Sequence, residues 1–369
     1  TFTKKIKHFS MKIGLMAGCS FNRFFALVFG FVNFLAVGQT FPDSLPMNEI
    51  RVLASHNSYK VAPSERTMKF INRFKAVLGE ENQPFQLAYN HVPIPEQLSI
   101  YHIRGLELDV YNDPKGGRYF KHRLNIFIPK QRVKEEKYQA LKLPGFKIIH
   151  IPDIDYQTNY QTLSSALDAL NQWSIENPQH APIFVNIELK GSALGDEAFI
   201  LRLFGFKKAI PFDKPSLDSM DHLFRAKLST LYSPKDFLNR EQTLQDRILH
   251  QGWPTLGEVK GRVFIIVQGS GSHLYPMLGN AFLYGNAENP NGIFMLCDDP
   301  FSNETLIQKN RNTHMIRTRT DAGTIEARTN DYNRLNKALS TGAQILSTDY
   351  YQPDPKIGSF VIPFVGFIK

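Results

Sequence analysis

Short runs of apolar residues, each ending in polar residues, recur along the chain and predict β-strands. The runs cover residues 48–55, 104–110, 147–150, 182–190, 262–268, 293–296, 314–319 and 344–349. Between several of them, apolar residues recur every three or four positions, and this spacing predicts helices. Strands that alternate with helices are typical of an α/β fold with a parallel sheet.

The number of predicted strands favours a (β/α)₈ barrel over a doubly wound sheet. Two stretches, 115–147 and about 192–235, are predicted to be excursions from the barrel. No internal repeat, low-complexity tract or linker marks a second domain, so the sequence predicts one barrel domain at residues 39–369. Helices are expected at residues 68–78, 95–98, 160–176, 234–250 and 331–339, the last one stopping at Gly342.

The predicted strand 104–110 carries two carboxylates, although a buried strand is expected to be apolar. Glu107 and Asp109 point to one side of the strand, and the apolar residues beside them point to the other. Two like charges about 6–7 Å apart repel each other, and burial would raise their pKa values. A bound cation would relieve both effects. The alternative is a solvated strand end at which the carboxylates pair with Arg104.

Three other predicted strands also end in residues that carry chemistry. His56 and Asn57 follow the first strand, His150 ends the third, and Glu188 and Lys190 end the fourth. In a parallel barrel the carboxyl ends of all strands face one mouth, so we expect these side chains to converge with the two carboxylates. Three carboxylates and an amide oxygen suit Ca²⁺ and not zinc. Two histidines near a metal suit acid–base work on a phosphodiester, because imidazole titrates near neutral pH.

Net charge says little about partners, because it is unevenly distributed. The chain of 369 residues has a formal net charge of +9, but residues 1–38 carry five Lys or Arg and no acid, which leaves residues 39–369 at only +4. A charge this small does not indicate nucleic-acid binding. The basic, aromatic-rich excursion 115–147 is either a solvated loop or a transient contact with an anionic membrane surface.

The first 38 residues have the pattern of a signal peptide. A basic region leads into the apolar run 24–37, which is short for a membrane span, and Ala36-Val37-Gly38 gives a small-x-small cleavage pattern. We therefore predict a signal peptide at 1–38, with Met11 as a candidate true start, and a secreted or periplasmic protein. The alternative is an uncleaved membrane anchor. After cleavage only Cys297 remains, so no internal disulfide is expected.

An ordered set of motifs resembles the catalytic barrel of calcium-dependent phosphoinositide-specific phospholipases C, and most closely the secreted, bacterial-type branch. The similarity covers residues 48–369. The motifs are Ser55-His56-Asn57-Ser58-Tyr59, Glu107-Leu108-Asp109, the His150 strand and Ile187-Glu188-Leu189-Lys190. Further similar stretches are Tyr89-Asn90-His91 with Gln97-Leu98, residues 150–155 and residues 317–354.

The resemblance implies a role for each matching residue. The implied reaction begins with attack of the inositol 2-hydroxyl on phosphorus and releases diacylglycerol and an inositol phosphate, which either stays cyclic or is hydrolysed further. His56 matches the first catalytic histidine, and His150 matches the second, which would protonate the departing lipid alkoxide. The resemblance leaves open which group accepts the proton of the 2-hydroxyl. A carboxylate such as Glu107 is the candidate, with His56 as a stabiliser. The resemblance also implies that Ca²⁺ is bound by Asn57, Glu107, Asp109 and Glu188.

Basic and aromatic residues at other strand ends are candidates for substrate binding. Lys190, Arg317 and Arg319 are expected to contact phosphate, the alternative being that they are solvated or paired with carboxylates. Tyr350 and Tyr351, just past the last strand, could stack on a sugar ring or pack in the core. The expected partners are a phosphoinositide or related phosphodiester and, transiently, an anionic membrane surface. The protein is expected to be a monomer.

Two other functions stay open. A glycerophosphodiester phosphodiesterase shares the barrel, the Glu-x-Asp strand and a histidine pair. Those enzymes typically have His-Arg-Gly at the first strand end, where this chain has His56-Asn57. The other alternative is a non-catalytic lipid- or sugar-binding barrel. The presence of both histidines and all candidate ligands argues against it.

Overall fold

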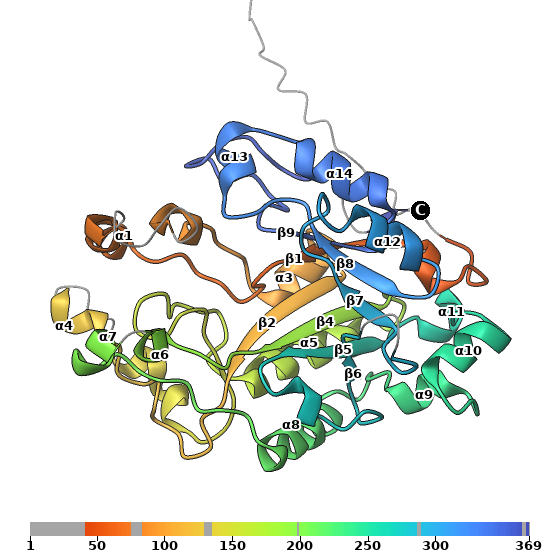
Figure 1. Ribbon diagram of the computed structural model, residues 1–369, viewed down its shortest axis with the longest axis horizontal. Helices are drawn as coiled ribbons and strands as arrows, with labels where there is room; N and C mark the ends of the chain where they lie inside the picture. Colours follow the sequence, from red (N-terminus) through yellow and green to blue (C-terminus); the bar gives the residue numbers. More distant parts are fainter. Residues whose placement is uncertain are drawn as a thin grey trace, which may run out of the picture. The chain divides into compact units, whose positions relative to one another are not determined.

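Parallel strands form a nearly closed barrel (Figure 1). Neighbouring strands follow the order β6-β5-β4-β2-β1-β9-β8-β7, and a parallel bridge between Tyr284 and Phe294 joins the two ends of this order. The predicted (β/α)₈ barrel is therefore confirmed. The barrel strands are β1 (Arg51–Ser55), β2 (Gly105–Tyr111), β4 (Ile183–Leu189), β5 (Val263–Gly269), β6 (Phe282–Leu283), β7 (Phe294–Leu296), β8 (Met315–Arg319) and β9 (Ile345–Thr348).

The structure is a computed structural model that describes residues 41–74, 83–128, 135–197, 199–285, 289–363 and 367–368. These residues belong to the second of two units into which the chain divides, Gly38–Lys369. The predicted signal peptide lies outside the described residues. Within the described ranges, no helix is both long enough and apolar enough to cross a membrane.

The prediction that residues 147–150 form a barrel strand is wrong. They contribute only β3 (Lys147–Ile148), which pairs antiparallel with the end of β2, where Ile148 lies opposite Val110. Strand β6 completes the barrel instead. It has two residues, which is too short for an apolar run to reveal it in the sequence. A second short strand, β10 (Phe367–Ile368), pairs antiparallel with β1.

Helices and 3-10 turns fill the connections. Before and after β1 lie η1 (Met47–Glu49), α1 (Glu65–Ile71), η2 (Asn72–Phe74), η4 (Pro84–Leu87) and α3 (Ile94–Ser99). Between β2 and β4 lie α4 (Leu124–Phe127), η6 (Glu135–Lys142) and α5 (Leu163–Glu176). The connection after β4 holds α6 (Leu194–Glu197), α7 (Phe199–Leu203), α8 (Lys214–Lys227), α9 (Pro234–Leu238), α10 (Leu244–Gln251) and α11 (Leu256–Val259). The rest are η7 (Ser272–Leu274), α12 (Glu304–Asn310), α13 (Ile325–Thr329) and α14 (Asn333–Thr341).

The predicted helix at 234–250 consists of two helices, α9 and α10. The break falls at Asn239 and Arg240, whose φ angles of 41° and 76° lie in the left-handed region and cannot continue a helix. Thr243 then starts α10, because its side chain accepts a hydrogen bond from the backbone N–H of Asp246. The predicted stop of α14 at Gly342 is confirmed, with a φ of 86° at that glycine.

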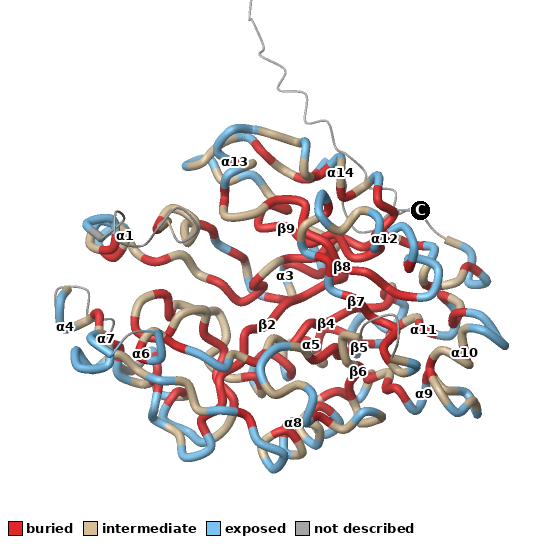
Figure 2. The backbone as a smooth tube through the Cα atoms, in the orientation of Figure 1, coloured by how far each residue is buried: buried red, intermediate tan, exposed pale blue. Residues whose placement is uncertain are grey.

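Side chains of the barrel strands alternate between two apolar layers. Inside the barrel, the rings of Phe184, Phe264, Phe282 and Phe294 pack with centroids 5.2 to 6.5 Å apart. The alternate residues of β2 and β4 face outward and pack against α3, α5 and α8, so the strands are buried on both sides (Figure 2). Fully burying one such side chain contributes about 1.5–3 kcal/mol. The same alternation turns the carboxylates of β2 and β4 into the barrel.

Candidate active site

Three carboxylates from two neighbouring strands meet inside the barrel. Asp109 on β2 lies directly opposite Glu188 on β4 in the parallel register. Together with Glu107 they offer oxygen atoms that all lie within 4.8 Å of one another. Glu107 and Asp109 are buried, whereas the side chain of Glu188 is 32% exposed. The structure therefore brings together the three carboxylates that the sequence singled out.

Asp109 is the least satisfied member of this cluster. Its Oδ1 atom is buried and has no hydrogen-bond partner among the described residues. Burial raises the pKa of Asp109 to about 6; the Lys190 ammonium opposes this rise, and the carboxylate of Glu188 adds to it. A buried carboxylate oxygen without a donor is costly, so this atom marks a position where a cation would be stabilised.

Two of the basic side chains that are expected to contact phosphate are paired with the carboxylates of the cluster in this structure. The Lys190 Nζ atom lies 2.8 Å from Glu188 Oε1 and 3.3 Å from Asp109 Oδ2. Arg317 Nη2 lies 2.5 Å from Glu107 Oε2, and both side chains are 3% exposed. Removing one partner of such a buried pair costs about 3–5 kcal/mol. In this structure the Arg317 side chain is therefore held in a buried ion pair with Glu107.

His56 follows β1 and is held by a carboxylate that the sequence analysis missed. Its Nδ1 lies 2.7 Å from Asp349 Oδ1, and its Nε2 lies 3.8 Å from Glu107 Oε2. Burial would raise the pKa of Asp349, but Arg319 and His56 hold it well below its usual range. The ionised Asp349 fixes the proton of His56 on Nδ1 and turns Nε2 toward the carboxylate cluster. Asp349 ends a predicted strand, and this position is the sequence signal that marks it as a candidate site residue.

His150 is held in the same manner by a second buried carboxylate. Its Nδ1 lies 2.6 Å from Asp155 Oδ2, and the fully buried Lys60 places Nζ 2.7 Å from the same oxygen. Burial opposes ionisation of Asp155, but Lys60 and His150 lower its pKa. The charged pair orients the imidazole so that Nε2 is left for a reacting group. No local sequence pattern links Lys60 to Asp155, because 95 positions separate them.

Asn57 lies beside the cluster in a fixed orientation. It is buried and has a φ of 50°, a left-handed conformation that asparagine tolerates better than most residues. Its Nδ2 donates to the Tyr89 hydroxyl at 2.8 Å, and its backbone N–H lies 3.4 Å from Glu107 Oε2. The Tyr59 hydroxyl donates weakly, at 3.4 Å, to its Oδ1. This network orients the amide oxygen, a suitable calcium ligand.

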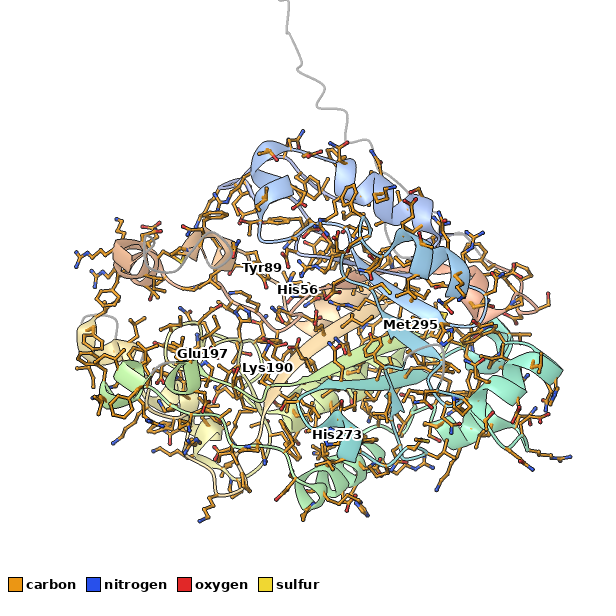
Figure 3. The ribbon with its side chains drawn as sticks, viewed as in Figure 1. His56, Tyr89, Lys190, Glu197, His273 and Met295 are labelled. Carbon is orange, nitrogen blue, oxygen red and sulfur yellow. The ribbon has the colours of Figure 1, made fainter. Side chains whose placement is uncertain are left out.

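The remaining predicted residues lie behind the histidines. Arg319 donates to Asp349 at 2.9 Å and lies 3.8 Å from Asp321. Tyr350 is 2% exposed and packs edge-on against Phe360, with ring centroids 6.1 Å apart, so in this structure it belongs to the core. Figure 3 shows the labelled His56 and Tyr89 together and Lys190 nearby, in the same part of the barrel.

The chain matches one family over most of its length. The family described as phosphoinositide phospholipase C, Ca²⁺-dependent, matches residues 45–368. A solved Ca²⁺-dependent phosphatidylinositol-specific phospholipase C from Streptomyces antibioticus has a TM-score of 0.50 at 14% identity, covering 87% of this chain and 99% of that one. A calcium-dependent phosphoinositol-specific phospholipase C from Pseudomonas sp. has a TM-score of 0.49 at 14% identity, covering 89% and 97%. No curated protein matches the chain. The Streptomyces structure supports the barrel fold.

Proposed function

Because the chain belongs to the family of Ca²⁺-dependent phosphoinositide phospholipases C, and is thus a calcium-dependent phosphodiesterase, we propose that it cleaves phosphatidylinositol-type lipids. The inositol 2-hydroxyl oxygen forms a bond to phosphorus, and the bond from phosphorus to the glycerol oxygen breaks. The products are a cyclic inositol phosphate and, after protonation, diacylglycerol. The observation that carries this proposal is the oxygen cluster on β2 and β4 flanked by two histidines, each bound to a buried carboxylate.

The oxygen cluster fits a calcium ion. Calcium takes carboxylate and amide oxygens, and the unpartnered Oδ1 of Asp109 lies among such atoms. The residues that would hold the ion are Asn57, Glu107, Asp109 and Glu188. When bound, calcium supplies positive charge that lowers the pKa of the 2-hydroxyl and offsets charge on the phosphoryl oxygens.

His56 acts on the phosphoryl side of the reaction. Asp349 binds its Nδ1 and stabilises positive charge on the ring, so Nε2 donates toward a phosphoryl oxygen. The proton of the 2-hydroxyl passes to a carboxylate, for which Glu107 is the candidate because its Oε2 lies 3.8 Å from His56 Nε2 and 3.4 Å from the backbone nitrogen of Asn57. His150 acts on the leaving group, where its Nε2–H protonates the glycerol oxygen. Asp155 and Lys60 keep that imidazole in place.

A substrate comparison tests this function. The enzyme is expected to release phosphorylated inositol from phosphatidylinositol in calcium, and not to release glycerol phosphate from glycerophosphodiesters. Release of glycerol phosphate alone would assign the chain to the glycerophosphodiesterase reaction. If neither substrate is turned over, the result would favour a non-catalytic binding protein.

We further propose that the protein is exported and meets its lipid at a membrane. The support is the basic and then apolar pattern of residues 1–38 and the small residues before Gln39. N-terminal sequencing of exported protein is expected to begin near Gln39. Mature material that retains the apolar run 24–37 would contradict export by cleavage.

A further inference from the structure

Large apolar side chains are exposed on two short helices, α4 and α7. Their exposed fractions run from 44% to 65%, and α7 has no buried residue at all. Single exposed apolar residues are common, but several on adjacent segments mark an interaction site. The two segments are adjacent, because Arg123, just before α4, donates to the backbone oxygen of Phe204, just after α7. The apolar residues are Ile126, Phe127, Phe199, Ile200, Leu203 and Phe204.

A basic cup lies beside these side chains. It has a volume of about 590 Å³ and is lined by Lys115, Arg118, Arg202, Lys207 and Lys208. Across the stretches 113–128 and 196–208 the sequence has seven Lys or Arg and three acidic residues. One of these acids, Asp113, is buried, and another, Asp196, is paired with Lys208. Lys207 is likewise paired with Asp153, so the net positive charge of the cup comes from Lys115, Arg118 and Arg202, next to an apolar surface.

We propose that this α4–α7 surface, meaning the six apolar residues and the five cations of the cup, docks on an anionic lipid membrane and binds lipid phosphate groups in the cup. The apolar side chains would enter the boundary between headgroups and acyl chains, while the cations stay at the level of the headgroups. A soluble polyanion would leave the apolar side chains in water. The inference rests on the proposed lipid substrate, because it supplies the way in which the enzyme reaches that substrate.

The surface is held together before any lipid binds. Asp153, which is fully buried, accepts hydrogen bonds from the backbone N–H of Arg123 and of Lys207, both at 2.8 Å, and forms an ion pair with the Lys207 side chain. Arg123 also donates to the backbone oxygen of Phe204. The connections after β2 and β4 are thus fixed side by side, so docking costs little ordering entropy.

The surface also lies at the end of the barrel that carries the active site. Helix α4 follows β2 and α7 follows β4, the two strands of the carboxylate cluster. Phe70 of α1 stacks on Phe127 of α4, with ring centroids 5.9 Å apart, so the connection after β1 joins the same edge. Figure 1 shows α1, α4, α6 and α7 at one end of the barrel, away from α9, α10 and α11. Docking there brings the barrel mouth to the membrane.

The test measures binding of the full chain to sedimented vesicles of phosphatidylcholine, with and without phosphatidylglycerol. Neither lipid contains inositol, so neither is the proposed substrate. The Phe199→Ser/Leu203→Ser variant removes apolar contact, and the Lys115→Gln/Arg202→Gln variant removes two cations. Each Lys or Arg near an anionic surface contributes about fivefold, so the second variant is expected to bind phosphatidylglycerol vesicles about 30-fold more weakly. The apolar variant is expected to bind vesicles at least tenfold more weakly than the unaltered protein, both at low and at high salt.

Matched controls separate docking from folding and from catalysis. Leu249→Ser, at a position 78% exposed on α10, and Lys235→Gln/Lys309→Gln change similar side chains elsewhere and are expected to bind like the unaltered protein. All variants and the unaltered protein are prepared with the same N-terminus. Activity on a water-soluble inositol phosphodiester is expected to be unchanged in every variant, while turnover of phosphatidylinositol in vesicles falls in parallel with binding.

Two results would overturn the proposal. One is binding of both surface variants at the level of the unaltered protein. The other is selective weakening of polyphosphate binding without any change in vesicle binding, which would indicate a soluble polyanion as the ligand. A protein that turns over no inositol phosphodiester but still docks through this surface would contradict the proposed function alone.

Discussion

At the scale of single residues, the ammonium of Lys190 shares the place proposed for calcium. Burial would lower the pKa of Lys190, but Asp109 and Glu188 raise it above its usual value, so the side chain is charged. It neutralises part of the cluster in the absence of a metal. A calcium ion that binds Asp109 and Glu188 must displace this contact.

Lys190→Met is therefore expected to raise the affinity for calcium by about tenfold, the equivalent of 1.4 kcal/mol. Lys190→Arg is expected to keep the calcium affinity of the unaltered protein. Calorimetric titration with calcium alone measures this without any turnover. Lys337→Met, which removes the contact with Glu304 elsewhere, is the matched control. Equal or weaker calcium binding by Lys190→Met would contradict the competition.

The two histidines differ in the step that they serve, and a change of leaving group separates them. A general acid contributes about 10²–10⁴-fold in rate, and less as the leaving group becomes more acidic. His150→Ala is expected to lose much less kcat/KM on an aryl inositol phosphate than on phosphatidylinositol, and Asp155→Asn should follow the same pattern. His56→Ala should lose similar factors on both. Equal losses for His150→Ala on the two substrates would remove it as the leaving-group acid.

The residues that sequence reasoning missed share one property. Asp349 contacts His56 across 293 positions, and Lys60 contacts Asp155 across 95. By contrast, Glu107 and Asp109 could be assigned to one face because a strand repeats every two residues. Periodicity reports which way a side chain points. It does not report the partner that folding brings from a distant strand.

At the scale of elements, the ends of β8 and β9 are joined through a buried carboxyl group. Asp321 accepts hydrogen bonds from the backbone N–H of Asp349, at 2.8 Å, and from the Thr348 hydroxyl. Burial and the nearby Asp349 raise the pKa of Asp321 to about 7. Since its usual pKa is 3.8, the folded protein holds this proton more tightly than the unfolded chain does.

The contribution of protonated Asp321 to the free energy of unfolding is thus fully present below about pH 4 and is lost as the pH rises toward 7. Asp321→Asn mimics the protonated form and lacks this loss. The free energy of unfolding of the unaltered protein, minus that of the variant, is expected to fall between pH 4 and 7 and to level off above. Denaturant titrations across this range measure the difference. Asp218→Asn, at a surface position, should give a flat difference, and a flat result for Asp321→Asn would refute the assignment.

Elements were predicted unevenly. Long apolar strands such as β4 and β5 and the capped helix α14 were visible in the sequence. The two-residue β6 was not, and β3 was assigned to the barrel because an apolar run does not reveal which strand it pairs with, or in which direction. The carboxylate cluster is nevertheless predictable from the sequence, because its members lie on β2 and β4, two strands with a clear apolar pattern.

At the scale of the whole molecule, the apolar core of the barrel is packed without the carboxylates of the proposed metal site. Its interior is filled by aromatic and aliphatic side chains at the end away from the carboxylates. A chelator is therefore expected to abolish turnover of phosphatidylinositol while leaving the circular dichroism of the fold in place, and added calcium should restore activity. Full activity in excess chelator would contradict calcium dependence in this chain.

The short β6 has a consequence for the way in which the barrel opens. Strands β2, β4 and β5 are joined by six and seven register pairs, whereas β6 shares two with β5 and meets β7 at one bridge. In hydrogen exchange, amides of β6 should lose protection before those of β4. A transient opening then starts on the far side of the ring from β2. The two strands that carry the carboxylates stay joined, so a partly opened molecule keeps its carboxylate cluster assembled.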